Sequence, residues 1–255
     1  VARTLRAAGN VVALSGEGAD ELFGGYDLAL ARAYALHRNG RATLAAAAAT
    51  ELEAASWIPS ASLESILNPE ILEAEGGPRA TLDAYEDAFS AIGYDDEPDP
   101  FLSHLRVQRR VNLAGLLLRL DSATMLASVE GRTPFADALV AAHAESLPTA
   151  DKFDAAPRDG ESAADRAART KLCLRRAYRA DLPELVTRRA KASFPLPFQE
   201  WIATPEVVAP LLATNFASQV FTEPALAAVR ANPAGLWRLA WPMLNLCLWS
   251  HTSST

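Results

Sequence analysis

The sequence has few cysteines and no long apolar run. Cys173 and Cys247 are its two cysteines among 255 residues, so we expect no disulfide framework and a cytoplasmic location. No stretch approaches the ~18 uninterrupted apolar residues of a membrane span, and the first residues show no signal-peptide pattern. Four scattered histidines give no zinc-type spacing, and acidic residues outnumber basic ones by 31 to 24. We therefore expect neither a membrane nor a nucleic acid as a partner.

What the sequence does contain is typical of a globular, helix-rich protein. Half of its residues are apolar and 22% are charged. Alanine, leucine, arginine and glutamate dominate, and apolar residues recur at three- and four-residue steps. This periodicity predicts helices at roughly 28–56, 79–92, 101–120, 136–147, 162–180 and 223–231.

One segment alone has the pattern of a buried strand, Val11-Val12-Ala13-Leu14, which follows Gly9-Asn10 and precedes a small polar turn. A parallel sheet needs several strands, each buried on both faces. We infer that the partners of this strand lie outside these residues and that the chain starts partway through an α/β domain. Such an edge also favours association with other chains.

The turn after this strand reads Ser15-Gly16-Glu17-Gly18-Ala19-Asp20-Glu21 and continues into Leu22-Phe23-Gly24-Gly25-Tyr26. Its small residues let a bound group approach the backbone, and amides at the start of the next helix favour an anion. Three carboxylates would repel a phosphate unless a divalent cation bridges the two, which predicts a metal–nucleotide. The alternative is that these acids only complement the dipole of a helix N-terminus and cap it.

Residues 14–26 closely resemble a signature of the glutamine-dependent asparagine synthetases. The resemblance implies an α/β fold: the mostly helical C-terminal portion of a Rossmann-like, parallel-sheet ATP-pyrophosphatase domain, with one strand followed by many helices. It also implies that ATP contacts the residues Ser15, Gly16, Glu17 and Gly18, that Asp20 binds Mg²⁺, and that Glu17 faces the acyl-adenylate as a catalytic residue.

A second block, residues 116–137, resembles the next block of that family. Asp121, Glu130 and Arg132 fall in place, and Thr133 and Ala136 depart from the usual residues. The residues alone allow another interpretation. Glu130 and Arg132 precede a proline that favours an extended Thr133, which predicts a partly buried structural ion pair that anchors a loop. We assign these three residues a structural role near the site.

The third block is strongly basic. Residues 169–191 contain eight basic and two acidic side chains, a net charge of +6. For 169–179 we interpret the charge as a solvated helix face. Arg189 and Lys191 instead lie in a segment with Phe194 and two prolines, and such rigid loops hold catalytic groups. The block resembles the family's ending, which implies that Arg189 and Lys191 contact pyrophosphate and that Lys191 also contacts the developing charge. Ser193 replaces a usual glycine.

Together the blocks imply that ATP activates a carboxylate, most simply that of aspartate, as an acyl-adenylate, and that ammonia then forms the amide. We assign residues 1–255 to the C-terminal portion of this domain. The family's glutaminase domain and Ser-Gly-Gly-x-Asp-Ser pyrophosphate loop are not in the sequence, and we expect them on a preceding half or a partner chain. The isolated chain is then not expected to turn over ATP. We also consider a homodimer.

Two other functions stay open. One is a related amide-forming synthetase of specialised metabolism, of the β-lactam synthetase or lasso-peptide cyclase type, which shares the scaffold but uses other substrates. Glu17 favours the first hypothesis, because the β-lactam-forming relatives tend to have tyrosine there. The other is a noncatalytic helical remnant, against which the presence of Glu17, Asp20 and Lys191 argues.

Overall fold

The computed structural model describes residues 1–189 and 197–253, and the chain divides into two compact units. Unit 1 comprises Val1–Ala54 and Ala84–Lys191, and unit 2 comprises Ala55–Asp83 and Ala192–Thr255. Each unit has its own buried apolar core. Among the described residues, no helix combines the length and the apolar character that crossing a bilayer requires.

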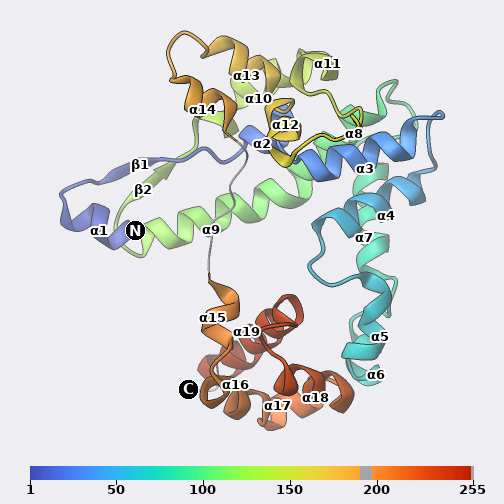
Figure 1. Cartoon of the computed structure of the whole chain (residues 1–255), viewed down its shortest axis with the longest axis vertical. Helices are drawn as coiled ribbons and strands as arrows, with labels where there is room; N and C mark the ends of the chain where they lie inside the picture. Colours follow the sequence, from blue (N-terminus) through green and yellow to red (C-terminus); the bar gives the residue numbers. More distant parts are fainter. Residues whose placement is uncertain (190–196, 254–255) are drawn as a thin grey trace. The chain divides into compact units, whose positions relative to one another are not determined.

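Unit 1 contains the strands and most of the helices (Figure 1). In chain order its elements are α1 (Ala2–Ala7), β1 (Val12–Leu14), α2 (Ala19–Phe23), α3 (Asp27–His37), α4 (Leu44–Ala55), α7 (Ala80–Ala91), α8 (Pro100–Gln108), the π-helical turn η2 (Arg109–Leu113), α9 (Ala114–Met125), β2 (Glu130–Arg132), η3 (Pro134–Ala136), α10 (Ala138–Ser146), α11 (Thr149–Lys152), α12 (Ala163–Ala168), α13 (Leu172–Ala177) and α14 (Glu184–Arg188). The last residue of α4 and the first four of α7 belong to unit 2.

The strands β1 and β2 pair in parallel, with Val12 opposite Glu130 and Leu14 opposite Arg132. This corrects the inference that the first strand has no partner in the chain, because residues 130–132 supply one. The predicted α/β class is confirmed, with two described strands in place of one. Two apolar side chains of β1 are nevertheless exposed to solvent: Val12 is 48% exposed and Leu14 is 76% exposed.

Local sequence explains most of the helix boundaries in unit 1. The predicted helix over 28–56 is two helices, α3 and α4, separated at Gly40, whose φ of +118° no helix accommodates. Asp99 caps α8 by accepting a hydrogen bond from the Phe101 amide at 2.9 Å, and Pro100 occupies its first turn. The predicted helix over 162–180 is also two helices, α12 and α13.

Unit 2 is a small helical unit. Its elements are η1 (Ser60–Ser62), α5 (Leu63–Ile66), α6 (Pro69–Ala74), α15 (Phe198–Ile202), α16 (Pro205–Leu212), α17 (Asn215–Val220), α18 (Glu223–Ala231) and α19 (Trp237–Ser253). Leu212, Leu226 and Val229 are fully buried in its core. Phe198 stacks on Trp237 and contacts Trp241, which fixes α15 against α19.

Candidate functional site

The candidate site begins where β1 ends. The Ser15 amide donates a hydrogen bond to the Arg132 carbonyl at 2.8 Å, which extends the strand ladder by one residue. The chain then turns at Gly18, the N-cap of α2, with a φ of +97°. A Cβ atom at Gly18 would lie 3.2 Å from the Ala136 nitrogen, so this position requires glycine both for its conformation and for space. Gly16, by contrast, has nothing within 4 Å of such an atom.

Two glycines follow α2 and leave room for neighbouring side chains. Gly24 ends the helix with a φ of +70°. At Gly25 a Cβ atom would lie 1.6 Å from Asp20 Oδ1, so the carboxylate occupies the space that any side chain would need. Gly25 therefore leaves the space that Asp20 occupies, and Gly24 leaves space for the Phe153 ring.

Asp20 forms an ion pair with Lys171, at 2.8 Å between Oδ1 and Nζ, and each side chain is 26% exposed. Lys171 is the N-cap of α13 and has a φ of +51°, which is uncommon for a residue other than glycine. The structure thus brings the acidic turn and the basic segment together. From the sequence, Lys171 was only one of the eight basic residues of 169–191, with no specific contact predicted for it.

The other carboxylates of the turn gather around Tyr26. Its hydroxyl donates a hydrogen bond to the buried carboxylate of Glu21. Burial raises the pKa of Tyr26, and the charges of Glu21, Asp20 and Glu17 raise it further. Glu21 therefore accepts a hydrogen bond from Tyr26, and no side chain caps the N-terminus of α2. Within residues 1–189 and 197–253, no group of three or more His, Cys, Asp or Glu side chains is arranged so that it could hold a metal ion.

The pair Glu130 and Arg132 differs from the prediction. Its ion pair exists, at 2.9 Å between Glu130 Oε1 and Arg132 Nη2, but both residues lie on β2 and their side chains are 54% and 64% exposed. The predicted partly buried loop anchor is therefore wrong, because β2 lies at an edge of the described sheet where these side chains reach solvent. Asp121, on α9, is exposed as well.

The basic segment is only partly the solvated face that we predicted. Arg176 is exposed and forms an ion pair with Asp151 at 3.2 Å, as such a face requires. Arg169 is 12% exposed and forms ion pairs with Asp154 and Glu161. The interpretation is therefore wrong for Arg169, because two acidic side chains from the preceding loop neutralise it.

Arg175 also departs from the predicted solvated face, because its side chain bonds to the backbone. Its guanidinium donates to the carbonyls of Thr170 at 2.7 Å and Ala167 at 2.8 Å, and to that of Thr187. Burial lowers its pKa. These bonds tie the end of α12 to α14, which leads to Arg189. Arg189 follows α14 in an extended conformation and is exposed, while Lys191 and Ser193 lie outside the described residues.

Comparison with known proteins agrees with the resemblance of the three blocks. A family model for asparagine synthase matches residues 1–251. The chain belongs to the asparagine synthase family. A putative glutamine-hydrolysing asparagine synthetase of Mycobacterium bovis is 32% identical over 141 residues, which is 52% of this chain and 20% of the relative. Asparagine synthetase 1 of Bacillus subtilis, also glutamine-hydrolysing, is 29% identical over 227 residues, which is 75% of this chain and 31% of the relative.

This member of the asparagine synthase family thus spans about a fifth to a third of the length of these curated relatives. No solved structure matches it significantly. The family match covers all of unit 1 and all but the last four residues of unit 2, whereas the candidate site described above lies in unit 1.

Proposed function

We propose that this chain is the C-terminal part of an ATP-dependent amide-forming ligase that makes asparagine from aspartate and ammonia. In the first step the aspartate β-carboxylate attacks the α-phosphorus of ATP, which releases pyrophosphate and leaves β-aspartyl-AMP. In the second step ammonia attacks the acyl carbon, AMP leaves, and a base takes the proton that ammonia loses. The glutaminase part and the Ser-Gly-Gly-x-Asp-Ser loop would come from a preceding half or a partner chain.

The observation that carries this proposal is the turn Ser15–Gly18 at the end of a parallel strand. Within the described residues, the amides of Gly16, Glu17 and Gly18 donate no hydrogen bond, so three successive N–H groups are available. Successive unpaired amides of this kind bind phosphate oxygens. The space above Gly16 is open, which lets a ligand reach the backbone. A nucleotide phosphate therefore fits this turn.

For Mg²⁺, we propose that this chain contributes a single carboxylate. Asp20 would hold the ion, since Mg²⁺ is commonly held by one or two carboxylates together with substrate phosphates. Asp20 would have to exchange its ion pair with Lys171 for the metal. The bound ion would offset negative charge on the phosphates.

The remaining roles fall to charged residues of the turn and of the basic segment. Glu17 is half-buried and lies near Tyr26, where its carboxylate would orient the incoming ammonia or accept its proton. Lys191, with Arg189 beside it, would stabilise the charge that develops on pyrophosphate as it leaves. Glu17 also favours asparagine formation over the chemistry of β-lactam-forming relatives.

The test uses a polypeptide that joins these residues to the glutaminase and pyrophosphate-loop parts, assayed for aspartate-dependent pyrophosphate release. Because Lys191 acts on charge that appears only in the transition state, Lys191→Ala should lower kcat by about 10²–10³-fold with little change in the KM for ATP. Lys191→Arg should not fully restore kcat, since a planar guanidinium does not replace a compact ammonium. Arg179→Ala, at an exposed position of the same basic segment, is the control and should retain activity. Wild-type turnover by a folded Lys191→Ala variant would refute the assignment.

Asp20→Asn separates the metal role from the phosphate role. The variant should bind Mg²⁺ more weakly, so its activity should partly return as the Mg²⁺ concentration is raised. Lys191→Ala should show no such recovery. Equal behaviour of the two variants across a Mg²⁺ titration would contradict the assignment of Asp20.

A further inference from the structure

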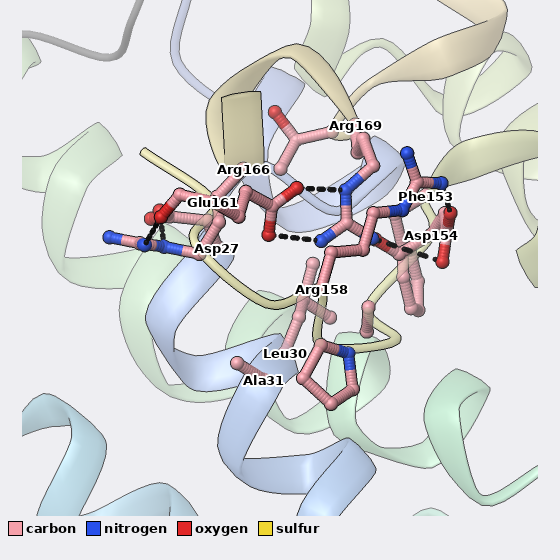
Figure 2. Close-up of a pocket in the computed structure, with 12 residues that line it drawn as sticks. Asp27, Leu30, Ala31, Phe153, Asp154, Arg158, Glu161, Arg166 and Arg169 are labelled. Atoms are coloured by element: carbon pink, nitrogen blue, oxygen red, sulfur yellow. Dashed lines mark hydrogen bonds and ion pairs between the residues drawn. The ribbon is translucent and has the colours of Figure 1, made fainter. Parts of the chain in front are cut away.

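Unit 1 contains a cavity that the proposed amide chemistry does not use (Figure 2). It lies between α3, the loop over 153–161 and the end of α12, and its volume is about 170 Å³. Leu30, Ala31, Phe153 and Pro157 supply apolar surface, and six charged side chains complete the wall. The volume exceeds that of a few waters but is below the ~300–1,000 Å³ typical of drug-sized ligands.

Most of the charged groups in this wall satisfy one another. Arg169 makes a two-point contact with Glu161, at 2.7 and 2.6 Å, and also pairs with Asp154 at 3.1 Å. Arg158 pairs with the other oxygen of Asp154 at 2.6 Å. Figure 2 shows these contacts as a continuous network along one side of the cavity. Two-point arginine–carboxylate contacts are strong, so this side has little capacity for a ligand.

On the other side, Arg166 and Asp27 form an ion pair that leaves one buried nitrogen of Arg166 without a hydrogen bond. Arg166 Nε lies 3.6 Å from Asp27 Oδ2, which is too long for a hydrogen bond. That nitrogen is buried and has no hydrogen-bond acceptor among the residues that the structure describes. Nη1 of Arg166 donates only to the Glu161 carbonyl, at 3.3 Å. A buried charged donor without a hydrogen-bond acceptor is costly, so its presence at a cavity wall requires an explanation.

We propose that this cavity binds a free α-amino acid with a small aliphatic side chain. Its carboxylate would contact Arg166 and its ammonium group Asp27. An α-amino acid carries both charges on one carbon atom, which suits two opposite charges 3.6 Å apart. A simple anion would leave Asp27 without a partner, and a simple cation would leave Arg166 without one. The apolar surface of Leu30 and Pro157 suits a short alkyl side chain.

The proposal is independent of amide formation, and its test needs neither ATP nor turnover. L-Alanine is titrated into the chain by calorimetry, and the ¹³C methyl resonances of Leu30 and Ala31 are followed in parallel. We expect saturable binding with a dissociation constant of about 1 mM, and binding about tenfold weaker for propionate and for ethylamine, which each carry one of the two charges.

Variants locate the binding. Arg166→Gln and Asp27→Asn should each weaken the binding of L-alanine about tenfold, because each removes one charged contact. Arg158→Gln is the matched control: its side chain is 60% exposed and Asp154 keeps its contact with Arg169, so binding should be unchanged. Circular dichroism checks the fold of each variant, and Asp27→Asn decides the matter if Arg166→Gln unfolds.

Three results would overturn the proposal. The first is the absence of a saturable shift of the Leu30 and Ala31 methyl resonances. The second is wild-type affinity in a folded Asp27→Asn variant. The third is equal affinity for propionate and L-alanine, which would indicate a plain anion site. Loss of the amide-forming activity in Lys191→Ala tests the other proposal and has no bearing on this cavity.

Discussion

At the scale of single residues, the glycines and charges of the turn after β1 explain why the motif has its composition. Gly18 and Gly24 have positive φ angles, whereas Gly25 is needed for space, because Asp20 lies over it. The sequence predicted small residues for the approach of a ligand. It did not predict that one of them accommodates the chain's own carboxylate, since that depends on how Asp20 folds back over the turn.

Gly25→Ala should therefore destabilise the protein. The added Cβ atom would lie 1.6 Å from Asp20 Oδ1, so the carboxylate must move away from Lys171. We expect a loss of about 1–3 kcal/mol in the free energy of unfolding, measured with urea. Gly16→Ala is the control, because its methyl group meets no atom within 4 Å and should cost much less. Equal stabilities for the two variants would mean that Asp20 does not lie over Gly25.

Lys171 shows the limit of prediction for single residues. Its place in the third block was recognisable, but its contact with Asp20 joins residues that are 151 positions apart in the sequence. Charge patterning within a helix reports only neighbours along that helix. The interpretation of 169–179 as a solvated face therefore held for Arg176 and failed for Arg169.

At the scale of elements, apolar periodicity located several helices but not their breaks or the second strand. The strand at 12–14 was predictable because it is a continuous apolar run. Its partner Glu130–Arg132 contains neither β-branched nor aromatic residues, so strand propensity gives no signal there. The π-helical turn η2 continues the helix from α8 into α9, and periodicity alone does not reveal it.

Buried polar contacts between helices α3, α4 and α8 likewise escaped the sequence analysis. The Ala42 amide donates to His37 Nδ1 at 3.3 Å, so the proton of a neutral His37 is on Nε2 and faces His104 Nε2 at 3.0 Å. His104 Nδ1 then donates to Glu51 at 2.7 Å, and Gln108 donates to the same carboxylate. These hydrogen bonds join three helices in one network.

This network should make the protein sensitive to acid. Burial, followed by the neighbouring His104 and Arg41, lowers the pKa of His37 to about 4 from an ordinary 6.5, and Asp99 opposes that shift. Because the folded pKa is lower than the unfolded pKa, the contribution to stability is complete above pH ~6.5 and is lost as the pH falls towards 4. We expect a loss of about 3 kcal/mol over this range, from urea unfolding at several pH values.

His37→Gln and His143→Gln distinguish this source from the general effect of acid. The first variant should be less stable at neutral pH but lose less stability between pH 6.5 and 4. The second, at an exposed position on α10, should follow the wild type. If the pH dependence of His37→Gln is unchanged, the acid sensitivity arises elsewhere.

At the scale of the whole molecule, the two units differ in composition in a way that allows their unfolding to be followed separately. All five tryptophans, Trp57, Trp201, Trp237, Trp241 and Trp249, belong to unit 2, so intrinsic tryptophan fluorescence reports on that unit alone. Most of the helices belong to unit 1, which therefore dominates the far-ultraviolet circular dichroism signal. The two signals should give different urea midpoints, because units with separate cores need not unfold together.

Two core variants make this prediction specific. Leu226→Ala removes a fully buried side chain from the core of unit 2 and should lower the fluorescence midpoint, by an amount that corresponds to about 2–5 kcal/mol. Leu30→Ala makes the same change in a core of unit 1, where the side chain is 1% exposed, and should lower the circular dichroism midpoint while the fluorescence midpoint stays in place. If either variant shifts both signals equally, the chain unfolds as one cooperative body, and the separate cores do not confer separate stabilities.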